Sequence, residues 1–267
     1  MWGLGRARGA RVLLRIEDHD AQRSRQEYEH ALIEDLAWLG FIPDEPPLTS
    51  FRAGLTEYRQ SHRGRVYLAA AQQLESAALL YGCDCARTSP YPGTCRSRGL
   101  PLDDGVTWRL RIAPGEERFC DLLRGWKTQS PADEHGDIAI RDRLGNWTYQ
   151  FVASVDDYVQ DIDLVIRGED LIASTGLQIA MARLMGRRTP ATFAHHELVM
   201  KSPTQKLSKS DGDTGVRDLR AAGWTPARVI GEAARAVGLV EAGRDLEARE
   251  VETLFARWQD GGVPSLG

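Results

Sequence analysis

The chain has 267 residues, a formal net charge of −4 and a sequence pI of about 5.9. Hydrophobic residues make up 42% of it and charged residues 27%, as is typical of a globular protein, so binding to nucleic acid through net charge alone is excluded. No apolar run is long enough to span a membrane and the N-terminus lacks the apolar core of a signal peptide, so we expect a cytoplasmic protein.

The first third of the chain predicts a strand followed by two helices. "RVLLRIEDHD" (11–20) begins with the short apolar run of a buried strand and ends in charged residues. Ser24 and Glu27 then predict a capping box for a helix that Gly40 ends, and a second helix is expected over 63–80, with Ser61 as its cap. A strand followed directly by helices predicts a parallel α/β sheet.

The charged end of this first strand is a candidate ligand site. Arg15, Glu17, Asp18 and Asp20 lie at its carboxyl end, where open α/β sheets bind ligands. A carboxylate there suits an ammonium group, and an arginine suits a carboxylate. The alternative is a salt bridge at the end of the strand.

Three of the four cysteines, Cys83, Cys85 and Cys95, fall in one short segment. Clustered thiols in a cytosolic chain favour a metal over a disulfide, and three thiolates fill three of the four positions around Zn²⁺. The phenolate of Tyr91, a water molecule or Cys120 remains open as the fourth ligand. The alternative is a group of free thiols at the surface.

A second candidate site follows the cysteine segment. Residues 106–112 alternate like a half-buried strand, and residues 136–172 predict a hairpin turning near Gly145, with Tyr149 on a strand, and then a buried strand over 162–166. This strand ends in Arg167-Gly168-Glu169-Asp170. Tyr149 is expected to project into the same crevice, where Arg167 suits the anionic side chain of a ligand.

The last third predicts a helix near 177–184, a short strand over 195–200 and then mostly helix, including a start at Thr225-Pro226 and an amphipathic helix over 246–258. Between them lies "KLSKS", whose Lys206 and Lys209 can neutralise the charge developing on a nucleotide triphosphate. The alternative is an exposed basic turn. The pairs Arg23 with Arg25, Arg96 with Arg98 and Arg187 with Arg188 are either local contacts for nucleic acid or solvated surface.

Taken together, these motifs resemble a known family. "KLSKS" is similar to the KMSKS signature of class I aminoacyl-tRNA synthetases. The order "LRIEDHD", Cys-x-Cys with Tyr and Cys, "NWTYQFVASVDD", "VIRGEDLI", "HHELVM", "KLSKSDGDTG" resembles the catalytic part of glutamyl-tRNA synthetases over residues 11 to about 238. The residues beyond Ser210 are too few for the family's helical anticodon-binding domain. The chain is therefore most similar to the shorter glutamyl-Q tRNA(Asp) synthetases.

The resemblance implies an α/β fold: a Rossmann-type class I synthetase catalytic domain with a small zinc-binding insertion and a helical C-terminal segment. The expected divisions are residues 1–82 and 102–212 for the catalytic domain, 83–101 for the insertion and 213–267 for the helical segment. One Zn²⁺ per chain is implied, held by Cys83, Cys85, Tyr91 and Cys95.

The resemblance also implies an activity and a set of roles. Members activate L-glutamate with ATP, here with Mg²⁺, and transfer it to the queuosine base of tRNA(Asp). Glu17, Tyr149 and Arg167 match the glutamate-binding positions, and Lys206 and Lys209 the catalytic lysines, with Lys209 contacting ATP. We expect a monomer with no membrane partner. The alternatives are a truncated glutamyl-tRNA synthetase acting on tRNA(Glu) and a catalytically incomplete binding remnant.

One signature of the family is not found. None of the six histidines lies in a context similar to the HIGH motif, which stabilises the α-phosphate region of ATP, and "MWGLGRARGARVLL" resembles the tail of the helix that follows it. We therefore expect the first strand and half of the ATP site to be missing. A misplaced start codon, a deliberately shortened chain and genuine loss each explain this.

Overall fold

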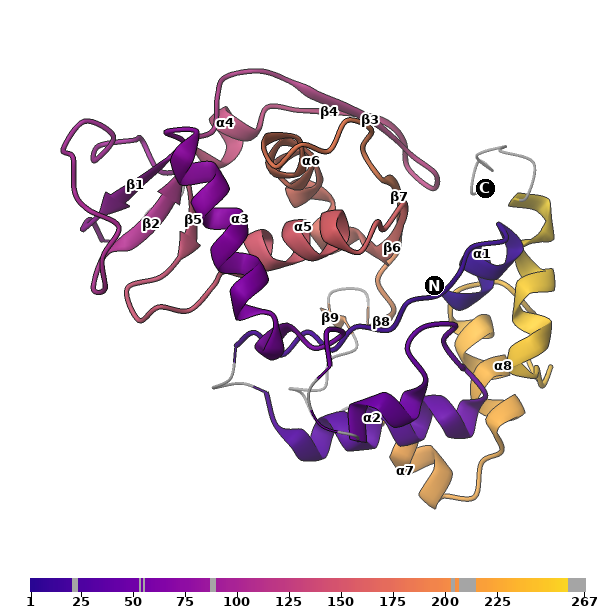
Figure 1. The fold of residues 1–267 in the computed structure, drawn as a ribbon. Helices are drawn as coiled ribbons and strands as arrows, with labels where there is room; N and C mark the ends of the chain where they lie inside the picture. The colour runs from indigo at the N-terminus through magenta and orange to yellow at the C-terminus, as the bar shows by residue number, and fades with distance from the viewer. Residues whose placement is uncertain are drawn as a thin grey trace.

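A computed structural model describes residues 1–20, 24–52, 54, 56–86, 90–202, 205–206 and 215–258 (Figure 1). The helices are α1 (Trp2–Ala7), α2 (Gln26–Leu39), α3 (Gly64–Ser76), α4 (Pro131–His135), α5 (Tyr149–Val159), α6 (Thr175–Leu184), α7 (Val216–Ala221) and α8 (Pro226–Ala236), with 3₁₀ segments η1 (Leu48–Arg52), η2 (Gln60–His62), η3 (Glu169–Ser174) and η5 (Ala248–Trp258). The strands are β1 (Leu80–Cys83), β2 (Thr107–Leu110), β3 (Glu117–Asp121), β4 (Gly125–Gln129), β5 (Ile138–Arg141), β6 (Leu164–Gly168), β7 (Thr192–His196), β8 (Met200–Ser202) and β9 (Gln205–Lys206).

A four-stranded mixed sheet in the order β4-β3-β7-β6 carries the candidate site. β7 lies parallel to both β3 and β6, while β3 and β4 form an antiparallel hairpin. The chain leaves β6, passes through η3 and α6 and returns as β7, which is the crossover that a parallel pair requires. The expected α/β architecture is confirmed. It places the ends of β3, β6 and β7 at one edge of the sheet.

The strand expected at the start of the chain is not formed as predicted. Among the described residues, the segment 11–16 makes only isolated parallel bridges, Leu13 with Glu45 and Ile16 with Arg59. The bridging partners belong to irregular segments, so no continuous ladder forms. The segment nevertheless keeps its buried side, because Ile16 packs with Ile33 and Phe51.

The two helices that follow begin later than expected. α2 begins at Gln26 with Arg25 at its N-cap and no side-chain cap bond, so the capping box of Ser24 and Glu27 is wrong. Its predicted end is confirmed, because Gly40 takes up the left-handed conformation that a C-cap favours. α3 ends at Ser76, since Ala78 is left-handed at φ 59°, and the Ser61 hydroxyl donates to Asp18 instead of capping α3.

The middle of the chain forms an antiparallel sheet in the order β1-β2-β5. The strand predicted over 106–112 is confirmed as β2. The expected hairpin is reduced to one bridge between Arg141 and Trp147, and Tyr149 is the first residue of α5 rather than part of a strand. All residues over 151–156 are buried, so this helix is covered on every side, and an apolar run of this kind does not by itself distinguish a strand from a buried helix.

The main core lies between this sheet and helices α3, α5 and α6. Trp147 is partly buried and packs against this core, with ring centroids 6.2 Å from Tyr67, 6.1 Å from Trp108 and 5.3 Å from Phe151. The first turn of α5 is therefore anchored by packed aromatic rings directly beside Tyr149.

The C-terminal segment is helical, as expected, and closes onto the N-terminal helix (Figure 1). Thr225 caps α8 by accepting from the amide of Arg228, with Pro226 at the first helical position. η5 packs against α1, and Gly3 allows this approach because a Cβ there would overlap Phe255 and Val251. Among the described residues, no helix combines the length and apolar character needed to cross a bilayer.

Candidate functional site

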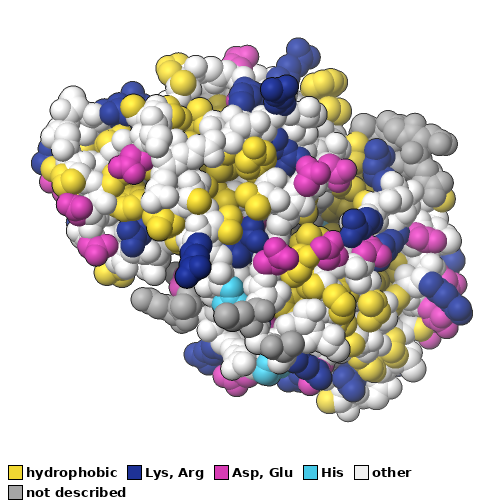
Figure 2. All heavy atoms as spheres, in the orientation of Figure 1, with side chains coloured by type: hydrophobic (Ala, Val, Ile, Leu, Met, Phe, Trp, Pro, Cys, Tyr) yellow, Lys and Arg dark blue, Asp and Glu magenta, His cyan; other side chains and the backbone are white. Residues whose placement is uncertain are grey.

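Three residues predicted to bind a ligand lie in one region, which we call the crevice after the crevice expected from the sequence. Glu17 follows the extended segment at the start of the chain, Tyr149 begins α5, and Arg167 lies on β6. Burial raises the pKa of Tyr149, with the charge of Glu17 acting in the same direction and that of Arg167 opposing it. One acid, one phenol and one guanidinium are therefore near enough to influence one another electrostatically. Figure 2 shows acidic and basic side chains interspersed across the middle of the displayed face.

Arg15 holds one wall of the crevice together. Its guanidinium lies 3.0 Å from Glu17, 3.0 Å from Asp157 and 3.0 Å from the side-chain oxygen of Gln160. Burial alone lowers the pKa of Arg15, but the carboxylates of Asp157, Glu17 and Asp156 raise it overall, so the guanidinium stays charged. The salt-bridge interpretation of this strand end is thus correct for Arg15, while Glu17 remains exposed to a ligand.

Asp156 stabilises this part of the crevice through buried hydrogen bonds. Its fully buried carboxylate accepts from Gln60 Nε2 at 2.9 Å, Arg63 Nε at 2.7 Å and the Tyr67 hydroxyl at 2.9 Å. Gln60 in turn lies 2.8 Å from His19 Nδ1. Asp18 contributes to a separate network, because its oxygens accept from Arg59 and Ser61.

Arg167 is surrounded by neutral acceptors. It donates from Nε to His195 Nε2 at 3.0 Å, from one terminal nitrogen to Gln178 Oε1 at 2.6 Å, and from the other to Thr175 Oγ1 at 2.9 Å. Burial lowers the pKa of Arg167, whereas Tyr149, Asp157 and Glu17 oppose that shift. Within the described part of the chain no carboxylate forms an ion pair with Arg167, so its charge is available to an anionic ligand.

A buried pair lies behind Arg167. His195 and Asp121 are both fully buried, and His195 Nδ1 lies 2.5 Å from a carboxylate oxygen of Asp121. Sequence reasoning missed Asp121, His195 and Gln178. The available signals were a charged residue at the end of the apolar "RFCD" strand and a histidine at the end of the strand before "ELVM".

The three clustered cysteines do come together. The thiols of Cys83, Cys85 and Cys95 lie within 4.8 Å of one another, and the Tyr91 hydroxyl lies 3.4 Å from Cys83 and 3.7 Å from Cys85. Burial raises the pKa of Cys95, but hydrogen bonds from Tyr91, Cys85 and Arg98 lower it overall to about 7. Three thiols and a phenol form a donor set that fits tetrahedral Zn²⁺.

Cys120 does not belong to this cluster. It lies on β3 in the other sheet, where its sulfur faces the carbonyl of Asp121. The Tyr91 hydroxyl lies beside the three thiols, whereas the position of Cys120 rules it out as a fourth zinc ligand in this cluster.

The lysines of the KLSKS motif can be located only in part. Lys206 is the last residue of β9, which pairs with β8, and nothing further is described of its side chain. Lys209 lies outside the described residues, as do the serines of the motif.

The paired arginines have partners within the protein. Arg96 forms an ion pair with the buried Asp137, and Arg98 forms one with Asp84. Arg187 donates to three backbone carbonyls. Arg96, Arg98 and Arg187 therefore stabilise loops, and for them the interpretation as a nucleic-acid patch is not supported. Arg23 lies outside the described residues.

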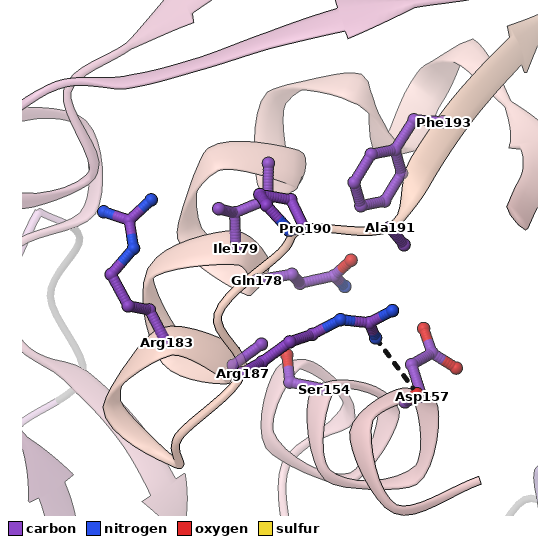
Figure 3. Close-up of a pocket in the computed structure, with 10 residues that line it drawn as sticks. Ser154, Asp157, Gln178, Ile179, Arg183, Arg187, Pro190, Ala191 and Phe193 are labelled. Carbon is purple, nitrogen blue, oxygen red and sulfur yellow. Dashed lines mark hydrogen bonds between the residues drawn. The ribbon is translucent and has the colours of Figure 1, made fainter. Parts of the chain in front are cut away.

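Arg187 also lines a small, partly open pocket between α5, α6 and the segment that leads to β7 (Figure 3). Asp157 and Gln178 line the same pocket and also contact Arg15 and Arg167. The pocket thus backs onto the crevice, but it contains none of the predicted site residues.

This sheet, its crossover and the crevice at the strand ends define a class I tRNA synthetase catalytic domain. The family described as "tRNA synthetases class I (E and Q), catalytic domain" matches residues 1–89 and 103–254, and the chain belongs to it. Members of this family are ligases that use ATP. The predicted fold class and family resemblance are confirmed.

Individual relatives carry two names. The glutamyl-Q tRNA(Asp) synthetase of Symbiobacterium thermophilum is 35% identical over 277 residues, covering 95% of this chain and 84% of the relative. That of Burkholderia cenocepacia is 33% identical over 285 residues, covering 100% of this chain and 89% of the relative. The glutamate–tRNA ligase 2 of Syntrophus aciditrophicus is 34% identical over 279 residues, covering 96% of this chain but only 56% of the relative.

A solved structure agrees with the fold. The glutamate tRNA ligase from Elizabethkingia meningosepticum, crystallised with its amino acid, superimposes with a TM-score of 0.75 at 23% identity. The match covers 94% of this chain and 59% of that protein, so the chain spans little more than half the length of this structural relative.

Proposed function

We propose that the protein activates L-glutamate with ATP and transfers the glutamyl group to the queuosine base of tRNA(Asp). An oxygen of the glutamate α-carboxylate attacks the α-phosphorus of ATP, and pyrophosphate leaves. A nucleophile on queuosine then attacks the acyl carbon of glutamyl-adenylate, and AMP leaves. Both steps depend mainly on positioning and charge neutralisation.

The observation that supports this proposal is the convergence of Glu17, Tyr149 and Arg167. Glu17, exposed at the rim, suits the substrate ammonium group. Arg167, partly buried among neutral acceptors, suits the side-chain carboxylate, and three of its five N–H groups are used by the protein. The two remaining N–H groups belong to a guanidinium whose orientation is fixed by these bonds, and a carboxylate requires donors in such a fixed geometry. Tyr149 interacts electrostatically with both charges, and we assign it to the same glutamate site.

The remaining predicted roles complete the proposal. Lys206 and Lys209 neutralise the phosphate groups of ATP, which binds with Mg²⁺. Cys83, Cys85, Tyr91 and Cys95 hold one Zn²⁺, which stabilises the insertion of residues 83–101. Residues 1–82 and 102–212 form the catalytic domain, and residues 213–267 a helical extension. We propose a monomer acting in the cytoplasm.

The proposal is tested by glutamate-dependent exchange of label between ATP and pyrophosphate, followed by transfer of labelled glutamate to tRNA. The assay uses the 267-residue chain and, beside it, the product of the longest reading frame that ends in this sequence. We expect exchange, and transfer to tRNA(Asp) that carries queuosine but not to tRNA(Asp) lacking it. Absence of exchange with both proteins contradicts the proposal.

A second candidate is glutamylation of tRNA(Glu), which the similarity to glutamate–tRNA ligase 2 favours. This activity is identified by labelled glutamate that is attached to the 3′ end of tRNA(Glu). The attachment should not depend on whether the tRNA preparation contains queuosine. Binding of ATP and glutamate by calorimetry without exchange instead identifies a binding remnant.

A further inference from the structure

A line of three side chains crosses the four-stranded sheet beneath the crevice. Asp121 ends β3, His195 lies on β7, and Arg167 lies on β6, so the strand order brings the three together. The distance from Asp121 to His195 Nδ1 is 2.5 Å, and that from His195 Nε2 to Arg167 Nε is 3.0 Å. Neither Asp121 nor His195 is accessible to solvent, so neither contacts a ligand directly.

The environment of Asp121 keeps its carboxylate ionised. Oδ1 accepts from the backbone amides of Leu123 and Arg124 at 2.9 Å each, and the amide of His195 lies 3.2 Å from both oxygens. Burial raises the pKa of Asp121, but its hydrogen bonds from His195 and Leu123 lower it overall. Oδ2 is therefore an acceptor, and Nδ1 of His195 must carry the proton.

Within the described part of the chain, the other ring nitrogen of His195, Nε2, faces two groups that can each donate a hydrogen bond to it. Arg167 Nε is a donor without exception, and the Thr175 hydroxyl lies 3.2 Å from Nε2. The lone pair of a neutral imidazole satisfies both, whereas a proton on Nε2 would point at the Arg167 N–H. The ring is further held by stacking on Phe193, at 6.0 Å between centroids.

We propose that Asp121 and His195 are positioning residues, which orient Arg167 for an anionic side chain and leave its charge uncompensated. A carboxylate in direct contact would hold the guanidinium equally well but would neutralise it. A neutral imidazole fixed by a remote carboxylate supplies orientation alone. This inference rests on the proposed function in one respect: the ligand side chain that Arg167 receives is that of glutamate.

Two substitutions at His195 separate the two hydrogen bonds. The side-chain oxygen of His195→Gln reaches the position of Nε2 and can accept from Arg167, whereas His195→Asn reaches only the position of Nδ1. We expect His195→Asn to raise the KM for glutamate by about ten- to hundredfold, the effect of losing a hydrogen bond to a charged group, with the KM for ATP within about twofold. His195→Gln should recover most of this loss. The control is His196→Asn, at the exposed neighbouring position.

A third substitution, at Asp121, moves the proton of His195 from one ring nitrogen to the other. In Asp121→Asn, Oδ1 keeps the amides of Leu123 and Arg124, so Nδ2 replaces Oδ2 and donates to His195 Nδ1. The proton of the imidazole must then move to Nε2, where it opposes the Arg167 N–H. Nitrogen NMR of ¹⁵N-histidine-labelled protein is expected to show Nδ1–H for His195 in the wild type and Nε2–H in Asp121→Asn, together with weaker glutamate binding.

These measurements keep the two proposals distinguishable. A wild-type His195 that is doubly protonated or carries its proton on Nε2 at about neutral pH overturns the inference, whether or not the protein is active. An unchanged KM for glutamate in both His195→Asn and Asp121→Asn also overturns it. If the wild type fails to exchange label, the proposed function fails, and calorimetry with glutamate on the same variants decides the inference instead. Melting curves identify a variant that has unfolded, in which case His195→Gln and the NMR spectrum of the wild type carry the decision.

Discussion

The carboxylates of the crevice differ in how many of their hydrogen-bond acceptor positions are filled by the protein. Asp156 has three donors and no exposure, whereas Glu17 is exposed and contacts only Arg15 among the ion pairs of the described residues. A fully satisfied buried carboxylate is part of the framework. A carboxylate with free acceptor positions at the rim is suited to a ligand. This distinction assigns a structural role to Asp156 and agrees with the binding role proposed for Glu17.

Replacing the framework acid should therefore destabilise the fold. Asp156→Ala leaves Arg63 buried without its carboxylate and is expected to lower the free energy of unfolding by about 3–5 kcal/mol. Urea denaturation measures the change. Asp104→Ala, at a side chain that is 95% exposed, is the control and should change stability by less than about 0.5 kcal/mol. Equal effects of the two substitutions would contradict this assignment.

The stability supplied by Asp121 should depend on pH. Its pKa is lower in the folded chain than in the unfolded chain, so the ionised carboxylate stabilises the fold above the unfolded pKa of about 4. That stabilisation is lost as the pH falls through the folded pKa. Denaturation at several pH values should thus show the wild type losing its advantage over Asp121→Asn below about pH 4. A difference that stays constant from neutral pH into this acidic range would show that the folded-state pKa is not lowered.

The residues of the crevice were predictable to different extents. Glu17, Tyr149 and Arg167 belong to motifs, so their types and their neighbours along the chain are enough to indicate a role. Asp121 and His195 act only because β3, β7 and β6 are neighbours, and a strand order is not written in any local pattern. The same holds for Gln178, which reaches Arg167 from α6.

Among the elements, the cysteine segment depends on a glycine that lies far from it in sequence. Gly136, after α4, has φ +65° and ψ −156°, and a Cβ there would overlap the backbone of Tyr91. Tyr91 and Gly136 also form an isolated parallel bridge. The backbone approach at Gly136 thus fixes the tyrosine proposed as the fourth zinc ligand.

A substitution at this glycine should weaken the metal site. Gly136→Ala is expected to displace Tyr91, lower the bound zinc measured by elemental analysis and cost more than the strain of a left-handed residue, which is about 1–3 kcal/mol. Gly99→Ala is the matched control, because Gly99 also has a positive φ, +63°, but open space around it. Zinc content that is unchanged in Gly136→Ala, or equally reduced in both, would show that the contact with Tyr91 is unimportant.

Element types were easier to predict than their partners. The helices near 26–39 and 64–76 follow from apolar spacing, and Gly40 ends the first of them as expected. The segment at 11–16 has the composition of a buried strand but, among the described residues, makes only isolated bridges. Tyr149 was placed on a strand because the hairpin signal at Gly145 was extended too far, past the start of the α5 periodicity.

At the scale of the whole molecule, α1 ties the helical segment to the mixed sheet. Leu4 packs against Ala194 and Ile166 of the sheet on one side and Phe255 of η5 on the other. The first helix and the last are therefore packed as one layer, although they lie at opposite ends of the described chain (Figure 1).

Two glycines of α1 test this packing. Gly3→Ala should overpack the contact with η5 and lower the free energy of unfolding by about 1–3 kcal/mol. In Gly5→Ala the new methyl group meets only Ile166 at 3.9 Å, so the gain in helix propensity should make it neutral or stabilising by up to about 1 kcal/mol. Thermal or urea denaturation compares them. A destabilised Gly5→Ala with an unaffected Gly3→Ala would reverse this account.

The aromatic rings beneath α5 make the crevice optically observable. Trp147 lies two residues before Tyr149 and is packed against Tyr67, Trp108 and Phe151, so a ligand that shifts the first turn of α5 must change the surroundings of its indole. Trp147→Phe would identify its share of the emission among the seven tryptophans of the chain. Fluorescence titration with glutamate could then follow occupancy of the crevice directly, without ATP, tRNA or turnover.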